Sequence, residues 1–448
     1  MPKTKSVEET FSPQPDRLPP DEFLCMQTRA AFEKISLFYG FEKMATSFLQ
    51  PLPFFSALAK AGLLDERNVV SGKLKTGEDA AMRLSGALSI LRAYVANKMN
   101  DLPHPLKFSF EGESFFLGRG VHAKLQSQEE AGLVMIGEEG PIAEAEIVLI
   151  LWKTIEALGI SPEKNKLSVN GIGCIQCRTQ FRSSLNAYFR QKINRLCKNC
   201  KRSFKKNPTQ ILLCEEEKCA ALASHAPQIL DLLCEGCKKH LRGFLEFLDE
   251  MQIPYALEPK LFREGLWFNQ LLFEISVEIK SNAVKNPAEG GTPELVPDPI
   301  LARRIVIAEG GRMSRAGEII VGRRLDAASA TLFLKDTQSV LVASGMLAQI
   351  LPKPKVFLAQ LGDLAKRKSF KMLEMLRAAG IEVRESLGRD ALKSQLTVAA
   401  HIEAEIALIL GQKEALDQTV IVREVVSGIQ ETISQDKLVE FLRRKLKK

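Results

Sequence analysis

The spacing of apolar residues predicts helices in the N-terminal third of the chain. From residue 21 to about 40, apolar side chains recur three and four positions apart, and a glycine then ends the pattern. The same spacing predicts helices at about 80–99 and 141–158, the second with proline at its start and Gly159 at its end. Between them, residues 107–120 alternate apolar and polar side chains, which predicts a hairpin at an exposed sheet edge.

The pattern changes twice in the rest of the chain. Residues 161–249 hold eight of the nine cysteines, so we interpret them as a separate inserted unit. A segment rich in Pro, Gly and Asn at 282–300 predicts a linker or a long loop. From about residue 352, apolar strands alternate with helices, which is typical of a small α/β domain with a buried sheet. The first 20 residues, polar and rich in proline, predict a flexible arm.

Composition narrows the class of protein. A chain of 448 residues with 45% hydrophobic and 26% charged residues is long enough for about three globular domains. The net charge of +8 permits a polyanionic partner such as RNA, and an excess of lysine on a solvated surface explains it equally well. No run of eighteen apolar residues occurs, which predicts no membrane span, and the polar N-terminus predicts a cytoplasmic protein with reduced thiols.

The cysteines occur in pairs whose spacing suits a metal. The first set, with two CxxC pairs nineteen residues apart, fits a tetrahedral zinc knuckle and consists of Cys174, Cys177, Cys197 and Cys200. The second set consists of Cys214, Cys219, Cys234 and Cys237. Which pairs combine stays open, and reduced thiols packed in a small domain are the alternative to structural zinc.

Several stretches carry a resemblance to a known family. They are GFEKMATSFLQ (40–50), MRLSGALSILRAYVANK (82–98), LPHPLKFSFEGESFF (102–116), IAEAEIVLILW (142–152), the cysteine-rich insertion, and the C-terminal stretch that begins PKVFLAQLGDLAKRKSF. Through them, the chain resembles the class II histidine–tRNA ligase family along nearly its whole length after residue 20.

The resemblance implies an α+β fold in three parts. A class II synthetase-like core, an antiparallel sheet with helices, would comprise residues 21–160 and 250–345. The cysteine-rich helical insertion would occupy 161–249, and an anticodon-binding-like α/β domain would occupy 352–448. The family binds ATP, histidine and tRNA and forms dimers, so tRNA and a second copy of this chain are the partners that the resemblance implies.

The positions that match the family's active site are mostly altered. Four arginines are retained, namely Arg83, Arg119, Arg263 and Arg312. Ser85 and Ala87 replace an acid and a hydroxyl that grip the substrate, and Phe116 and Gly118 replace the motif 2 arginine and the glutamate that contacts adenine. The remaining altered positions, where the family has Arg, Gln, Glu and two Tyr, are Gln126, Glu130, Val134, Trp267 and Phe268.

These replacements remove charge from a site that needs it. Adenylation brings a carboxylate to the α-phosphate of ATP, and arginines normally neutralise these two anions. We therefore predict a catalytically impaired, tRNA-binding or regulatory paralogue that forms a homodimer. The alternative is an active histidine–tRNA ligase with a divergent pocket, which would use ATP and Mg²⁺. A third interpretation is a scaffold that binds a regulatory protein partner through the apolar pocket.

Two basic runs bear on RNA. In the insertion, the run that begins at Lys198 and includes Lys201 and Arg202 favours contact with RNA phosphates. At the C-terminus, Arg443 and Arg444 belong to a run that we interpret as a solvated helix face.

Overall fold

The computed structural model describes residues 19–118, 124–204, 207–262, 267–285, 294–345, 354–388 and 391–446. The described residues form two compact units, 19–345 and 354–446. The predicted N-terminal arm lies outside the described residues except for Pro19 and Pro20, with which the first helix begins. Within the described part of the chain, no helix combines the length and the apolar composition that a membrane crossing requires.

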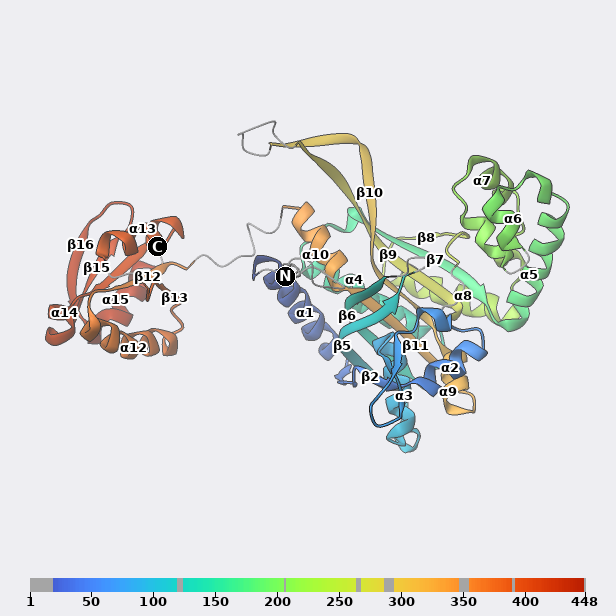
Figure 1. The fold of residues 1–448 in the computed structure, drawn as a ribbon, viewed down its shortest axis with the longest axis horizontal. Coiled ribbons are helices and arrows are strands. Elements are labelled where there is room, and N and C mark those ends of the chain that lie inside the picture. Colours follow the sequence, from blue (N-terminus) through green and yellow to red (C-terminus); the bar gives the residue numbers. More distant parts are fainter. Residues whose placement is uncertain are drawn as a thin grey trace, which may run out of the picture. The chain divides into compact units, whose positions relative to one another are not determined.

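An eight-stranded sheet is the centre of the first unit (Figure 1). The two outermost pairs, β1–β5 and β7–β8, are parallel, and every pair between them is antiparallel. In spatial order the strands are β1 (Glu42–Lys43), β5 (Leu106–Leu117), β6 (Leu125–Ile136), β11 (Ala327–Phe333), β10 (Glu294–Arg312), β9 (Asn269–Lys285), β7 (Asn165–Gly173) and β8 (Tyr255–Leu257). This predominantly antiparallel sheet with packed helices confirms the predicted α+β class.

The hairpin predicted within 107–120 is wrong in its extent, because these residues supply only the first of two consecutive antiparallel strands. Residues 106–117 form the single long strand β5, which pairs along its whole length with β6. Gly112 does not turn the chain. It adopts a φ of +131° inside the strand, and a Cβ atom there would lie 2.3 Å from Nη2 of Arg83. The glycine therefore makes room for a buried arginine, which alternation of apolar residues cannot reveal.

The predicted linker at 282–300 is also wrong where the structure describes it. Strand β9 continues to Lys285 and β10 begins at Glu294, and the two pair as a long antiparallel ribbon. Residues 286–293 lie outside the described part. Pairing between β9 and β10 supplies hydrogen-bond partners for the backbone N–H and C=O groups there. Composition alone does not reveal this pairing.

Helices cover the sheet in two groups. In the first, α1, α4, α8 and α10 pack on one another and on the sheet. Their bounds are Pro19–Phe38, Ile142–Ala157, Glu235–Glu250 and Leu334–Ala343. In the second, α9 packs on both α2 and α3, with bounds Leu52–Lys60 (α2), Gly86–Ala96 (α3) and Ser314–Val321 (α9). The helices predicted at 21–40 and 141–158 are confirmed as α1 and α4.

The helix predicted at 80–99 is shorter than expected. Strand β4 (Asp79–Met82) first pairs with β2 (Leu49–Pro51) and β3 (Ser71–Lys73) in a small sheet. Helix α3 begins only after Ser85, whose hydroxyl accepts a hydrogen bond from the Ala87 N–H as an N-cap.

The cysteine-rich insertion starts later than predicted. Residues 165–173 of the expected insertion at 161–249 form β7, which pairs with β9 and so belongs to the main sheet. After Cys174 the chain forms helices α5 (Ile175–Arg190), α6 (Lys198–Phe204) and α7 (Glu217–Ala223), together with a 3-10 helix, η6 (Pro208–Leu213). Helix α8 then brings the chain back against α4 and the sheet.

The second unit has a five-stranded sheet with apolar residues on both faces. Residues of odd and even number along β12 pack into two separate cores, with Val356 and Leu358 in one and Phe357 and Ala359 in the other. In spatial order the strands are β13 (Val383–Glu385), β12 (Val356–Gln360), β14 (Ile406–Leu410), β15 (Thr419–Glu424) and β16 (Gln430–Ser434). The helices are α12 (Asp363–Ala378), α13 (Leu392–His401), α14 (Gln412–Asp417) and α15 (Leu438–Lys445). This is the α/β pattern that the sequence predicts.

A buried ion pair joins the main sheet to two helices. Arg312, at the end of β10, is fully buried and donates two hydrogen bonds to Glu144 on α4, at 2.8 and 2.5 Å. The same guanidinium donates to the backbone carbonyls of Glu138 and Gly140. His240 on α8 lies 2.9 Å from the Glu144 carboxylate. Burial alone would raise the pKa of Glu144, but His240 and Arg312 hold it below its ordinary value.

We expect Glu144→Gln to lower the free energy of unfolding by about 3–5 kcal/mol, because Arg312 would keep its charge in the interior without a counterion. The matched control is Glu146→Gln on the same helix. Glu146 pairs with Lys107 at 2.7 Å while both remain partly exposed, so its loss should cost less than about 1 kcal/mol. Urea unfolding followed by tryptophan fluorescence measures both, since Trp152 lies on α4. Equal losses in the two variants would contradict the role of the buried pair.

Candidate functional site

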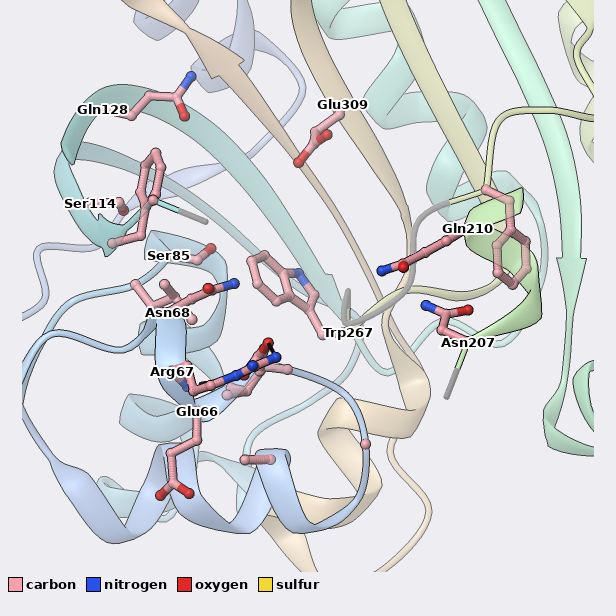
Figure 2. A pocket seen from close by; sticks show the side chains of 18 of the residues that line it. Glu66, Arg67, Asn68, Ser85, Ser114, Gln128, Asn207, Gln210, Trp267 and Glu309 are labelled. Carbon is pink, nitrogen blue, oxygen red and sulfur yellow. Dashed lines mark hydrogen bonds and ion pairs between the residues drawn. The ribbon is translucent and has the colours of Figure 1, made fainter. Parts of the chain in front are cut away.

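A cavity of about 1360 Å³ lies between the main sheet, the loop after α2 and the insertion. The sheet contributes residues of β5, β6, β10 and β11, and the insertion contributes residues of α6 and η6. Figure 2 shows Trp267 between Ser85 and Asn68 on one side and Gln210 and Asn207 on the other. The volume is large enough for a nucleotide-sized ligand.

Five of the altered positions predicted from the sequence line this cavity. They are Ser85, Phe116, Gly118, Glu130 and Trp267. Among the other altered positions, Gln126 is exposed beside Gly118, and three side chains are buried in the core, namely Ala87, Val134 and Phe268. The structure therefore brings together positions at the end of β5, in the middle of β6, at the start of α3 and at Trp267.

The two retained arginines that the structure describes do not line the cavity. Arg312 is held by Glu144, and Arg83 is 1% exposed. The Nε atom of Arg83 donates to the Glu113 carbonyl at 2.8 Å, and its guanidinium lies 4.9 Å from the centre of the Phe48 ring. Burial lowers the pKa of Arg83, against the charges of Glu130 and Glu113. Arg119 and Arg263 lie outside the described residues.

Glu130 is a buried carboxyl at the wall of the cavity. Its Oε1 accepts hydrogen bonds from the Gly86 N–H at 2.6 Å and from the Ser114 hydroxyl at 2.5 Å. Burial raises the pKa of Glu130 to about 7, although Ser114, Gly86 and Arg83 act to lower it and Glu309 adds to the rise. A group with this pKa can exchange a proton near neutral pH.

Close packing fixes the position of the Gly86 N–H. A Cβ atom on Gly86 would lie 2.2 Å from the Phe110 ring, and one on Gly132 would lie 2.3 Å from the same ring. Phe110, on β5, therefore brings the start of α3 against β6. This contact is what allows the first turn of the helix to reach Glu130.

Sequence reasoning missed several residues of the cavity wall. On the sheet they include Ser114, Gln128, Glu309 and Thr331. Ser114 lies two positions before Phe116, and Gln128 two positions before Glu130, so each shares a strand face with a residue that was predicted. The period of two along these strands could have found them. The insertion side of the wall, which includes Asn207 and Gln210, had no such signal.

Trp267 supplies an aromatic wall with an unused donor. Its indole N–H has no hydrogen-bond partner among the described residues. The neighbouring Phe268 is 3% exposed and packs in the hydrophobic core.

The eight clustered cysteines form two groups, and the grouping differs from both sets drawn from the sequence. One group consists of Cys174, Cys177, Cys234 and Cys237, and the other of Cys197, Cys200, Cys214 and Cys219. In each group the sulfur atoms all lie within 4.8 Å of one another. All nine cysteines of the chain are described, and all are free of disulfides. Each group could hold a metal ion.

In each group, hydrogen bonds favour the thiolate of one cysteine, whereas burial raises the pKa of the cysteines at 177, 200, 219 and 237. The Cys200 N–H donates to the Cys197 sulfur, and this bond chiefly lowers the pKa of Cys197 to about 7. A backbone N–H from Cys237 lowers the pKa of Cys234 to about 7 in the same way. A thiolate is the form of cysteine that binds metal.

Glu130 should make the stability of the first unit depend on pH. Its pKa is about 7 in the folded chain and near 4.5 when unfolded, so the free energy of unfolding should fall as pH rises from 4.5 to 7. Glu130→Gln should remove this loss, with a gain of up to about 3 kcal/mol at pH 8 and little change at pH 5. Urea unfolding at the two pH values measures it. Glu246→Gln, on the exposed face of α8, is the control, and equal pH dependence in both variants would refute the assignment.

Comparison with known proteins agrees with this architecture. The anticodon binding domain model matches residues 355–445. The histidine–tRNA ligase of Thermodesulfovibrio yellowstonii is 28% identical over 410 residues, covering 91% of each chain. That of Pelotomaculum thermopropionicum is 27% identical over 437 residues, covering 96% of each.

Solved structures show the same fold. The apo histidyl-tRNA synthetase of S. aureus aligns over 97% of this chain and 99% of its own, with a TM-score of 0.73 and 22% identity. The ATP phosphoribosyltransferase regulatory subunit/histidyl-tRNA synthetase of Bacillus halodurans aligns over 91% of this chain and 99% of its own, with a TM-score of 0.57 and 13% identity. With the three parts in the same order and the C-terminal domain matched, the chain belongs to the class II histidyl-tRNA synthetase family.

Proposed function

We propose that this chain is a tRNA-binding member of the family that has lost most of its capacity to form histidyl-adenylate. The observation that carries the proposal is Phe116. It lines the cavity at the position where the resemblance places the arginine that contacts the α-phosphate and the substrate carboxylate. An apolar ring can neither neutralise these anions nor donate hydrogen bonds to them.

The electrostatics of the described wall point the same way. Its cations are Lys60, Arg67 and Arg202, and Arg67 already makes a two-point ion pair with Asp65, at 2.9 and 2.7 Å. Glu130 and Glu309 add carboxyl groups to the wall. Among the described residues of the wall, no arginine takes the place of the one that Phe116 replaces on β5, and the loss of one such contact typically costs roughly 100–1,000-fold in rate.

An active histidine–tRNA ligase with a divergent pocket is the second candidate. The observation in its favour is that the cavity remains open, with a volume of about 1360 Å³, although its charged groups have been replaced. In this case ATP and Mg²⁺ would bind together with histidine, and the polar groups of Ser114 and Gln128 would contact them.

Binding of tRNA is supported by two regions. The matched anticodon binding domain spans most of the second unit. In the first unit, Lys198, Lys201 and Arg202 on α6 are exposed, and Arg202 lines the cavity. Positive side chains at this edge suit the phosphates of an RNA end that approaches the cavity.

Further parts of the proposal concern partners and location. We propose a homodimer, in keeping with exposed apolar side chains on α1 and β2 such as Leu37, Phe38 and Leu49. A regulatory role would add a protein partner. We also propose bound zinc as a structural component and the cytoplasm as the location, where thiols stay reduced.

Histidine-dependent exchange of pyrophosphate into ATP tests the loss of adenylation. We expect the purified chain to exchange at least roughly 100-fold more slowly than the S. aureus enzyme under the same conditions, because the phosphate-binding arginine is replaced. Exchange within tenfold of that enzyme would end the proposal and favour the active ligase.

A pair of charge-matched variants tests tRNA binding at α6. Lys201→Ala/Arg202→Ala should weaken tRNA binding and reduce the slope of log affinity against log salt by about two, one for each lost phosphate contact. Arg443→Ala/Arg444→Ala removes the same charge from α15 and should change the slope less. Filter binding over a salt series measures both. Equal effects would contradict contact at α6, and an absence of binding by the unaltered chain would remove tRNA as the partner.

A further inference from the structure

The two cysteine groups lie at different places in the insertion, and each is complete on its own. We call them the root cluster (Cys174, Cys177, Cys234 and Cys237) and the wall cluster (Cys197, Cys200, Cys214 and Cys219). We infer that each cluster binds one zinc ion, that the root ion fastens the insertion to the main sheet, and that the wall ion holds in place the segment that lines one side of the cavity. The inference rests on the zinc binding proposed above and requires neither ATP nor tRNA to bind.

The sulfur positions fit a tetrahedral ion. Four sulfurs at about 2.3 Å from zinc lie about 3.8 Å from one another. In the root cluster, Cys174 lies 3.6 Å from Cys177 and 4.0 Å from Cys234, sulfur to sulfur. In the wall cluster, Cys197 lies 4.0 Å from Cys214. Four soft thiolates favour zinc over magnesium or calcium.

Backbone N–H groups complete the surroundings of the sulfurs. The Cys234 N–H donates to the Cys177 sulfur at 3.2 Å, and the Cys197 N–H donates to the Cys219 sulfur at 3.2 Å. Such bonds offset the negative charge of the four thiolates and orient them. In each cluster they also link the first cysteine pair to the second, although the two bonded cysteines are 57 positions apart in the root cluster and 22 in the wall cluster.

The root cluster lies where the insertion leaves and rejoins the sheet. Cys174 directly follows β7, and Cys234 directly precedes α8, which packs on α4 and β7. Gly173 has a φ of +67°, and a Cβ atom there would lie 2.5 Å from the Cβ of Cys177. The glycine at the end of β7 thus lets a ligand cysteine approach closely. Because Cys174 and Cys234 lie at the two ends of the insertion, an ion bound here would hold both ends together.

The wall cluster encloses the residues that face the cavity. Cys200 lies on α6 and Cys214 directly follows η6. Between these two cysteines, Arg202, Asn207 and Gln210 line the cavity. The described residues of this stretch bury few large side chains, such as Phe204 and Ile211, so a bound metal would supply much of its stability. The insertion side of the cavity wall is therefore a short loop that the wall ion would close.

Zinc content of matched fourfold variants tests the number of ions and the pairing of cysteines. The full chain and the control Cys25→Ser should hold two zinc ions, measured by plasma mass spectrometry after expression with added zinc. Serine at all four root positions should leave one ion, and serine at all four wall positions should also leave one. Serine at Cys174, Cys177, Cys197 and Cys200, one pair from each cluster, should leave none.

Two other outcomes would contradict the inference. A full chain without zinc would show only packed thiols and would overturn the inference while leaving the proposals on adenylation and tRNA unaffected. If the root variant lost both ions and the crossed variant kept one, the cysteines would pair in sequence order and the assignment would be wrong.

Hydrogen exchange separates the tasks of the two ions. In the wall variant, amides of residues 198–213 should exchange at least roughly tenfold faster than in the full chain, because their closed loop is released. In the root variant they should keep most of their protection while amides near Cys174 and Cys234 exchange faster. Unchanged protection of 198–213 in the wall variant would refute the role of the wall ion.

Discussion

The carboxylate of Glu144 is the point on which the first unit depends. A fully buried anion is tolerated in the interior only when fixed donors surround it, and here Arg312 and His240 supply them. These three residues come from α4, the end of β10 and α8, so one charge network ties the sheet to the helix that returns from the insertion. The arginine that the family resemblance marks as retained thus serves the fold.

The cavity is shaped by the pairing of strands, whereas the chemistry of its described wall depends on a few side chains. Positions on β5 and β6 converge on one space, because strand pairing and the packing of Phe110 between two glycines do not depend on the side chains at the wall. Phe116 and Trp267 line the wall with aromatic rings, and Glu130 adds a carboxyl whose pKa burial raises to about 7.

Local patterns in the sequence predicted helices α1 and α4 of the first unit and β12, α12 and β14 of the second unit. Each of these elements has a short-range periodicity of apolar residues and clear ends. The errors all involve distant partners. To predict that β5 continues through Gly112, one must know that the buried Arg83 side chain packs against this glycine. To predict the β9–β10 ribbon, one must know that the two segments pair, because their composition is typical of a loop. For the site, five altered positions were found because they follow a family pattern. The insertion side of the wall and the cysteine pairing depend on tertiary contacts that no spacing rule contains.

The placement of Cys174 and Cys234 has a consequence for how such chains diversify. Their sulfurs lie 4.0 Å apart although sixty positions separate them, so the chain exits and re-enters the sheet at one spot. The entropy of closing a loop grows only slowly with its length. Material between the two exits can therefore lengthen, shrink or be exchanged without altering the span that β7 and α8 must bridge. The insertion can therefore change in length and sequence without disturbing the sheet. The part of the cavity wall that it supplies can evolve separately from the part that the sheet supplies.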